Sequence, residues 1–298
     1  MTNRFRILPF VALLITVGAA IPAHAQETTG SRFDFATGAR PLGMSGTYNA
    51  VGTGAAGLYH NPAGIAAANM YSLNGTYEFT PSTNVLSASI VDSKTNSNIA
   101  AGVGYSYLLG RSELSNSFGH DIRLALAIPA VPDRVSVGVE GRYAILNTDG
   151  TELARGFTME AGFLFRIVDK LKLGVVGRNL IDICDRPRVC RTVTPLTMAG
   201  GLAYGEGSPF TATADVEVDL GSEEDQVNLR YQIGGEYLVA GSVPIRVGYE
   251  HKTFTETDHV SLGAGWRASR FGIDIAGQME IQDPEALRIS SSFAVYFK

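Results

Sequence analysis

The sequence predicts an all-β protein, a transmembrane antiparallel β-barrel of about fourteen strands with an N-terminal plug that contains a short helix. Three observations predict this fold. The chain begins with an export leader, its later part alternates apolar and polar residues with a period of two, and a glycine- and alanine-rich segment separates these two parts. Alternation places one kind of side chain on each face of a strand. We therefore expect lipid outside the barrel and a polar lumen inside it.

Residues 1–25 have the composition of a cleaved signal peptide. Arg4 and Arg6 precede an apolar run, and Ala23-His24-Ala25 offers a small-x-small cleavage site. An uncleaved membrane anchor is the alternative, but a proline and a glycine interrupt a run that is already short for a span of ~20 residues. We therefore expect export of a mature chain that begins near residue 26.

The composition excludes two classes of protein. The mean hydropathy is +0.08, and no apolar run beyond the leader approaches the ~18 residues of a membrane helix, which excludes a helical inner-membrane protein. Of the 24 basic residues, Arg4 and Arg6 belong to the leader, which leaves 22 against 29 acidic residues. The mature chain therefore lacks the basic surface of a nucleic-acid-binding protein. An exported soluble β-protein and a transmembrane barrel remain.

Alternation after the glycine-rich segment predicts a barrel over residues 70–298. In the clearest run, Val135 to Ile145, valine, tyrosine and isoleucine occupy one face, while serine, glycine, Glu140 and Arg142 occupy the other. A soluble β-sandwich shows the same alternation because it buries its apolar face. The connections between the strands must decide between these two folds.

The connections indicate a bacterial outer-membrane barrel. Short turns such as 168–170 and 269–270 alternate with longer polar connections such as 109–117 and 147–154. Short periplasmic turns and longer outer loops are typical of such barrels, so we expect the protein in the outer membrane, surrounded by its lipid. The expected strands lie near 70–79, 85–91, 98–108, 118–129, 134–146, 155–168, 170–182, 195–204, 208–219, 228–239, 243–252, 258–268, 269–281 and 287–297.

The two cysteines, Cys184 and Cys190, lie close together in a polar connection that this arrangement places outside the cell. In an oxidising compartment such a pair predicts a disulfide that closes one loop. A metal site is the alternative, but the neighbourhood has no histidine to complete it. We therefore expect a disulfide and no metal.

Residues 26–69 do not alternate, and their many glycines and alanines favour a plug inside the barrel. Asn61 is suited to cap a short helix that runs to Ala68, because its side chain can accept a backbone N–H bond and Pro62 fits the first helical position. A flexible tail is the alternative, which apolar residues such as Leu42 and Leu58 disfavour.

Two stretches of this segment, from Gly38 to Gly46 and from Leu58 to Gly64, resemble the plug signature of the long-chain fatty-acid transporter (FadL) family and of its PorV-type relatives. The resemblance implies a fourteen-stranded outer-membrane barrel with an N-terminal hatch. Pro41 and Ser45 depart from the usual small residues of the signature. The chain also lacks the long outer insertions that capture an apolar ligand in fatty-acid transporters. The resemblance thus implies the fold more directly than the substrate.

Charged residues recur on the inward face of the expected strands, and buried charges must be paired. We expect a cross-lumen network that grips the plug, with Arg40 as the anchor to an inward carboxylate such as Glu140 or Glu160. A functional role for these charges is the alternative. The expected network comprises Glu140, Arg142, Glu160, Arg178, Arg230, Glu236, Arg246 and Glu250.

The expected strand at 98–108 has almost no side chains on its inner face, because Gly102 and Gly104 lie on that face. One interpretation is a passage beside the plug, with the glycines permitting a kink toward lipid. The other is that small residues make room for the plug. With the plug residues Arg40, Asn61, Pro62 and Gly64, these glycines complete the candidate ligand and plug residues.

No catalytic site is recognisable, because the five histidines are scattered and no Gly-x-Ser-x-Gly elbow or phosphate-binding loop is present. We expect no enzyme activity and no cofactor. The first hypothesis is passive transport of small hydrophobic compounds such as fatty acids. The alternative is a docking barrel that anchors partner proteins of an envelope complex for secretion or surface motility, as PorV-type relatives do.

Overall fold

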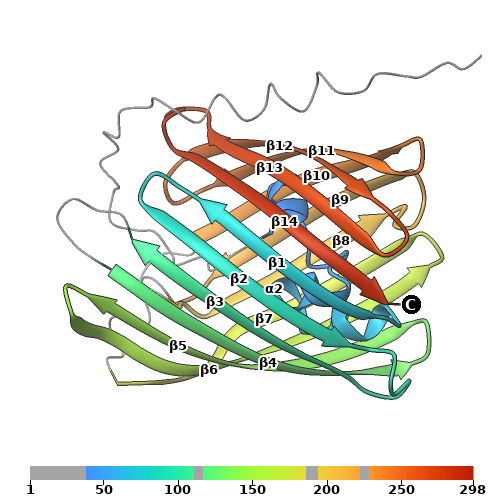
Figure 1. Cartoon of the computed structure of the whole chain (residues 1–298), viewed down its shortest axis with the longest axis horizontal. Coiled ribbons are helices and arrows are strands. Elements are labelled where there is room, and N and C mark those ends of the chain that lie inside the picture. Colours follow the sequence, from blue (N-terminus) through green and yellow to red (C-terminus); the bar gives the residue numbers. More distant parts are fainter. Residues whose placement is uncertain (1–37, 111–116, 186–193, 222–227, 298) are drawn as a thin grey trace, which may run out of the picture.

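The structure is a computed structural model that describes residues 38–110, 117–185, 194–221 and 228–297. Within these residues, fourteen antiparallel strands form one closed barrel (Figure 1). Each strand pairs with the next along the chain, and the last pairs with the first. The predicted fold class and strand number are confirmed. The predicted signal peptide and residues 26–37 of the predicted plug lie outside the described residues.

The strand boundaries differ from the predicted ones by a few residues, because turns and loops extend or shorten individual strands. The strands are β1 Tyr71–Phe79, β2 Thr83–Asp92, β3 Ala100–Gly110, β4 Ser117–Val131, β5 Val135–Thr148, β6 Thr151–Val168, β7 Leu171–Cys184, β8 Thr197–Tyr204, β9 Phe210–Asp219, β10 Asn228–Val239, β11 Val243–Lys252, β12 Thr257–Arg267, β13 Phe271–Glu280 and β14 Leu287–Phe297.

The barrel closes between β1 and β14. Tyr71 pairs with Phe297, and the register continues to Phe79 opposite Ile289. Closure leaves no unpaired strand edge, so the backbone N–H and C=O groups of the strands are satisfied within the wall, as a membrane requires.

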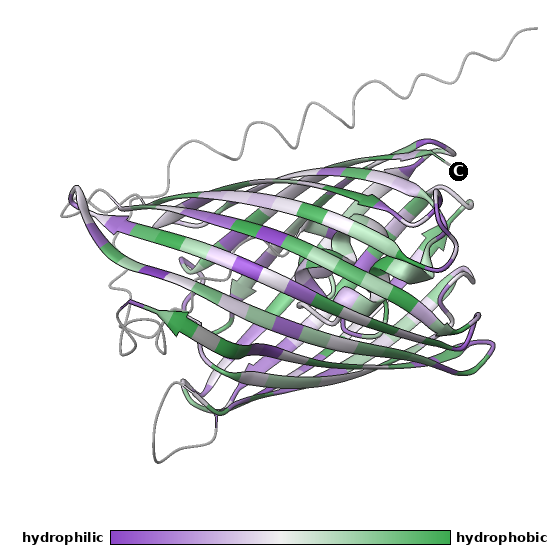
Figure 2. Cartoon of the chain, turned by 90° about the horizontal axis from the view of Figure 1, so that it is seen from below, coloured by the Kyte–Doolittle hydropathy of each residue, from purple (hydrophilic) through white to green (hydrophobic). Residues whose placement is uncertain are grey.

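Apolar side chains point outward from the barrel. On β4, Ile122, Leu124 and Leu126 are 46%, 58% and 44% exposed, whereas Asp121 and Ala125, on the other face of the strand, are fully buried. The same alternation runs along the other strands (Figure 2). A β-sandwich would bury its apolar face, so the observed orientation excludes that alternative and fits a wall in contact with hydrocarbon.

The segment from residue 38 to residue 69 lies inside the barrel (Figure 1), and we call it the lumen segment. Its helical turns are short: α1 Ala39–Leu42, η1 Gly54–Ala56, α2 Gly57–His60 and η2 Pro62–Ala67. No described helix is long and apolar enough to cross a membrane. The side chains of Leu42, Met44, Val51, Leu58 and Ile65 are at most 1% exposed, so the segment supplies most of the largest fully buried apolar side chains of the described residues.

The two halves of the lumen segment face opposite parts of the wall. The α1 turn contacts β12, β13 and β14, whereas η2 contacts β3, β4, β5 and β6. This placement decides which wall residues each part of the segment meets.

A candidate ligand site between the lumen segment and the wall

Glycines in the wall allow the backbone of the lumen segment to approach closely. A Cβ atom on Gly138 or Gly162 would overlap Pro62 or Asn61, and one on Gly174 would overlap the carbonyl group of Asn49. These three glycines were not among the predicted site residues. Their signal in the sequence is that each occupies an inward position of an alternating strand.

Asn61 fixes the second half of the segment. Its side-chain oxygen accepts the N–H of Ala63 at 3.1 Å and caps η2, as predicted, with Pro62 in the first turn. Its side-chain nitrogen donates to the carbonyls of Asn49 at 2.8 Å and of Phe163 on β6 at 3.1 Å. Asn61 therefore joins a helix cap to the barrel wall, a second contact that local sequence does not reveal.

Gly64 serves a packing role within the lumen segment. A Cβ atom at this position would overlap the carbonyl group of Gly52. Only glycine permits this contact between the two backbones.

Asp215 on β9 holds the middle of the lumen segment. Its Oδ2 accepts the backbone N–H groups of Tyr48 and Asn49, both at 3.0 Å, and the side-chain amide of Asn49 at 2.8 Å. The carboxylate is 2% exposed. Asp215 was not among the predicted network residues, because alternation assigns it a face but not a backbone partner.

A first group of charges lies on β4, β5 and β6. Arg123 pairs with Asp121 at 2.8 Å and with Glu140 at 2.9 Å, and Arg142 pairs with Asp121 at 2.5 Å. Glu160 lies 3.6 Å from Arg123. The structure thus brings together the predicted residues Glu140, Arg142 and Glu160, and it adds Asp121 and Arg123, which the prediction missed.

Arg178 on β7 links this group to the lumen segment. Its Nη2 donates to the side chain of Asn49 and to the carbonyl of His60, both at 2.7 Å. It also pairs with Glu217 at 2.8 Å and lies 4.0 Å from Glu160.

The same series of charges continues along the wall to β11. Arg230 lies 3.9 Å from Glu217 and 3.9 Å from Glu250. Charges on β4 to β11 therefore form one series along the inner wall.

A second cluster surrounds Glu236 on β10. Arg40 donates Nε and Nη2 to the two carboxylate oxygens, each at 3.0 Å. Arg246 and Arg267 also donate to Glu236, at 2.6 and 2.8 Å. Arg40 therefore meets Glu236 and not Glu140 or Glu160, because α1 lies against β12–β14 while those two carboxylates lie on β5 and β6.

Two further groups complete this cluster. Asp274 on β13 forms an ion pair with Arg246 at 2.7 Å. The hydroxyl of Tyr48 accepts a hydrogen bond from Arg40 Nη1 at 2.8 Å. Burial raises the pKa of this hydroxyl, so Tyr48 stays neutral beside the arginine.

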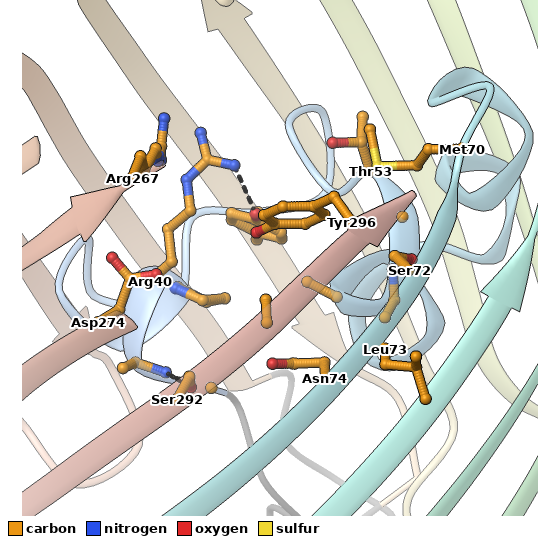
Figure 3. Close-up of a pocket in the computed structure, with 18 of the residues that line it drawn as sticks. Arg40, Thr53, Met70, Ser72, Leu73, Asn74, Arg267, Asp274, Ser292 and Tyr296 are labelled. Atoms are coloured by element: carbon orange, nitrogen blue, oxygen red, sulfur yellow. Dashed lines mark hydrogen bonds between the residues drawn. The ribbon is translucent and has the colours of Figure 1, made fainter. Parts of the chain in front are cut away.

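A cavity of about 300 Å³ lies beside this cluster, between the lumen segment and the inner wall of β1, β12, β13 and β14 (Figure 3). Its lining combines alanine and methionine side chains with Arg40, Arg267, Asp274, Ser292 and Tyr296. Ala268 and Ser269, in the short turn between β12 and β13, also line it, so the cavity lies toward the barrel end that carries the short turns.

The open space is not beside Gly102 and Gly104, where one interpretation of the sequence placed a passage. A Cβ atom on Gly102 would lie 2.9 Å from Leu58, and one on Gly104 would lie 3.0 Å from the Tyr59 hydroxyl. The two glycines therefore make room for the lumen segment. The sequence showed that β3 has almost no side chains on its inner face, but it did not show that the lumen segment fills the space beside it.

The disulfide between Cys184, which ends β7, and Cys190 stays a prediction, because Cys190 lies outside the described residues. Among the residues that the structure describes, no group of three or more histidine, cysteine, aspartate or glutamate side chains is placed to hold a metal ion.

The sequence matches no protein-family model and no curated protein. The fold matches the monoaromatic hydrocarbon channel CymD with a TM-score of 0.65 and 13% identity, over 89% of this chain and 98% of that one. It also matches the Pseudomonas putida toluene transporter TodX with a TM-score of 0.65 and 12% identity, over 90% and 99% of the two chains.

A Pseudomonas aeruginosa FadL homologue matches with a TM-score of 0.61 and 10% identity, over 87% of this chain and 97% of that one. The chain has the fold of these proteins. The predicted resemblance to the FadL family is therefore confirmed for the fold. The relationship to PorV-type proteins stays a prediction.

Proposed function

We propose that the protein is an outer-membrane channel for passive uptake of small hydrophobic compounds. The observation that carries this proposal is the cavity of about 300 Å³ between the lumen segment and the wall of β1, β12, β13 and β14. A pocket of this size is at the lower limit of small-molecule sites, so it suits a small compound. The shared fold with CymD and TodX, which are named as a hydrocarbon channel and a toluene transporter, supports the same class of cargo.

The distribution of charge favours passage along one side of the lumen. Within the described strands, β2 and β3 carry no charged inward side chain, and β1 and β14 carry only the ion pair of Glu78 and Arg288. The remaining inward side chains of β14 and β1 are mostly small, such as Ser290, Ser292 and Thr76. Beyond the charges around Glu236, a hydrophobic compound moving along β14 and β1 displaces few charged groups from their partners, so the free-energy barrier on that part of the path is low.

The same distribution anchors the lumen segment on its other side. Asp215, Arg178 and Asn61 bind its middle and second half to β9, β7 and β6. The α1 turn is tied mainly by Arg40 to Glu236 and by Ala39 N–H to Ser292 at 2.9 Å. We infer that a shift of α1 against β12–β14 opens the cavity, while the rest of the segment stays bound.

Uptake by cells tests the proposal. A deletion strain, the complemented strain and a strain carrying an unrelated porin are given labelled toluene and labelled oleate. We expect faster toluene uptake in the complemented strain than in both others, and the oleate arm tests the predicted transport of fatty acids. Equal toluene and oleate uptake in all three strains would contradict the proposed function.

The alternative function, a docking barrel of an envelope complex, has one observation in its favour. The hairpin of β5 and β6 has strands of 14 and 18 residues, whereas β1 and β2 have 9 and 10. A longer hairpin offers a rigid surface to a partner protein. Crosslinking in intact cells distinguishes the two functions, because a docking barrel gives a stoichiometric partner that is lost when residues 147–152 are replaced by glycine and serine.

A further inference from the structure

The charges around the cavity do not balance. Three guanidinium groups, those of Arg40, Arg246 and Arg267, surround Glu236. Asp274 is the only acidic residue among those that line the cavity in the described part of the chain, and it is paired with Arg246. Three cations thus share two carboxylates, which leaves one positive charge in excess. Glu206 does not correct this balance, because it is paired with Lys172.

Arg267 carries the donors that remain for a ligand. Arg40 uses Nε and Nη2 on Glu236 and Nη1 on Tyr48. Arg246 is fully buried between Glu236 and Asp274 and does not line the cavity, so its remaining donors are not accessible to a ligand. The side chain of Arg267 makes one hydrogen bond within the described residues, from Nη2 to Glu236, and it is 31% exposed where it lines the cavity.

Away from the arginines, the lining of the cavity is uncharged within the described residues. Ala55, Ala294 and Met70 supply its apolar surface, and Thr53, Ser72 and Asn74 lie beside Met70 on the same side (Figure 3). An apolar cavity of ~150 Å³ is enough to hold benzene. The volume of about 300 Å³ therefore accommodates one aromatic ring with a polar substituent but not a whole long acyl chain.

From this arrangement we infer that the cavity binds a small organic anion, an aromatic or short-chain carboxylate, with its carboxylate on Arg267 and its hydrocarbon part against Ala55, Ala294 and Met70. The inference rests on the proposed function, since it names a class of compound that the channel accepts. A guanidinium group presents paired N–H donors that match a carboxylate. Binding of an anion also neutralises the excess positive charge, so a neutral compound of the same shape binds less tightly.

Calorimetric titration of the purified full-length protein in detergent tests this inference, with benzoate and its neutral analogue benzyl alcohol as probes. We expect benzoate to bind the wild type at least tenfold more tightly than benzyl alcohol does. Arg267→Gln should remove this preference and leave the affinity for benzyl alcohol unchanged. Arg267→Lys should retain part of the preference, because it keeps the charge but loses the paired donors.

Arg270→Gln is the matched control, because Arg270 is exposed in the adjacent turn and does not line the cavity. It should bind both probes as the wild type does. Equal affinities of the wild type for benzoate and benzyl alcohol would overturn the inference, and so would an unchanged preference in a folded Arg267→Gln protein. Should Arg267→Gln fail to fold, Arg267→Lys decides, since an undiminished preference there contradicts carboxylate recognition by the guanidinium.

Toluene uptake by cells separates this inference from the proposed function. If the wild type shows no preference for benzoate but still carries toluene, only the anion site is wrong. If the uptake rates of toluene, oleate and benzoate all stay at the level of the deletion strain, the proposed channel function fails as well.

Discussion

The carboxylate of Asp215 on β9 accepts the backbone N–H of Asn49 in the lumen segment at 3.0 Å. A wall residue thus satisfies a backbone donor that helps to hold the segment in the barrel. Asp215→Ala leaves the N–H groups of Tyr48 and Asn49 without this acceptor, so we expect the segment to be destabilised by about 1–3 kcal/mol. Hydrogen exchange should be faster at residues 48–52, while Asp169→Ala, in an exposed turn, should leave it unchanged.

Asn61 both caps η2 and donates hydrogen bonds to the carbonyls of Asn49 and Phe163, and two substitutions separate these roles. Asn61→Asp keeps the acceptor for Ala63 N–H but loses the donors to Asn49 and Phe163, whereas Asn61→Ala loses both. We expect limited proteolysis of the lumen segment to be faster in both variants, since either leaves carbonyls without a donor. Loss of the cap adds about 1 kcal/mol in the alanine variant. Wild-type protection in Asn61→Asp would show that the wall contacts contribute nothing.

The cluster around Glu236 predicts that loss of Glu236 lowers the free energy of unfolding more than loss of one of its arginine partners. Arg40→Ala leaves Glu236 with Arg246 and Arg267, so we expect a loss of roughly 1–2 kcal/mol in the free energy of unfolding. Glu236→Ala leaves buried Arg246 with Asp274 as its remaining partner in this cluster, and we expect a loss of roughly 3 kcal/mol. Equilibrium unfolding in detergent, followed by the fluorescence of the single tryptophan, Trp266, measures both. Equal losses would contradict the shared role of Glu236.

Wall glycines predict where added volume is tolerated. Gly174→Ala places a Cβ atom against the backbone of Asn49, whereas Gly75→Ala meets nothing within 4 Å. We expect Gly174→Ala to destabilise the lumen segment by about 1–3 kcal/mol and Gly75→Ala to leave its hydrogen exchange unchanged. If the two variants behave alike, close backbone approach at Gly174 is not what seats the segment.

The barrel was predictable because a strand has a side-chain period of two. Once Val135 and Val137 are assigned to lipid, Glu140 and Arg142 must face the lumen, and the structure places them there. The cap at Asn61 was predictable for the same reason, since it depends on residues adjacent in sequence.

The pairing inside the lumen was not predictable from the sequence. Alternation assigns Glu140 and Glu236 to the same face, but it does not say where around the barrel the lumen segment lies. That position depends on contacts between residues far apart in the sequence. One example is the hydrogen bond from Arg178 to the carbonyl of His60, which joins residues 118 positions apart. For this reason Arg40 was assigned the wrong carboxylate, and the cavity beside β1 and β14 was not foreseen.

The most direct test of the account is toluene flux through protein reconstituted in vesicles, measured for variants that fill or spare the cavity. Ala294→Trp places a large side chain in the cavity, whereas Ala264→Trp places the same side chain on the exposed outer face of β12. We predict that Ala294→Trp reduces the flux at least tenfold and that Ala264→Trp leaves it at the wild-type level. Undiminished flux in a correctly folded Ala294→Trp barrel would show that the compound does not pass between the lumen segment and this wall.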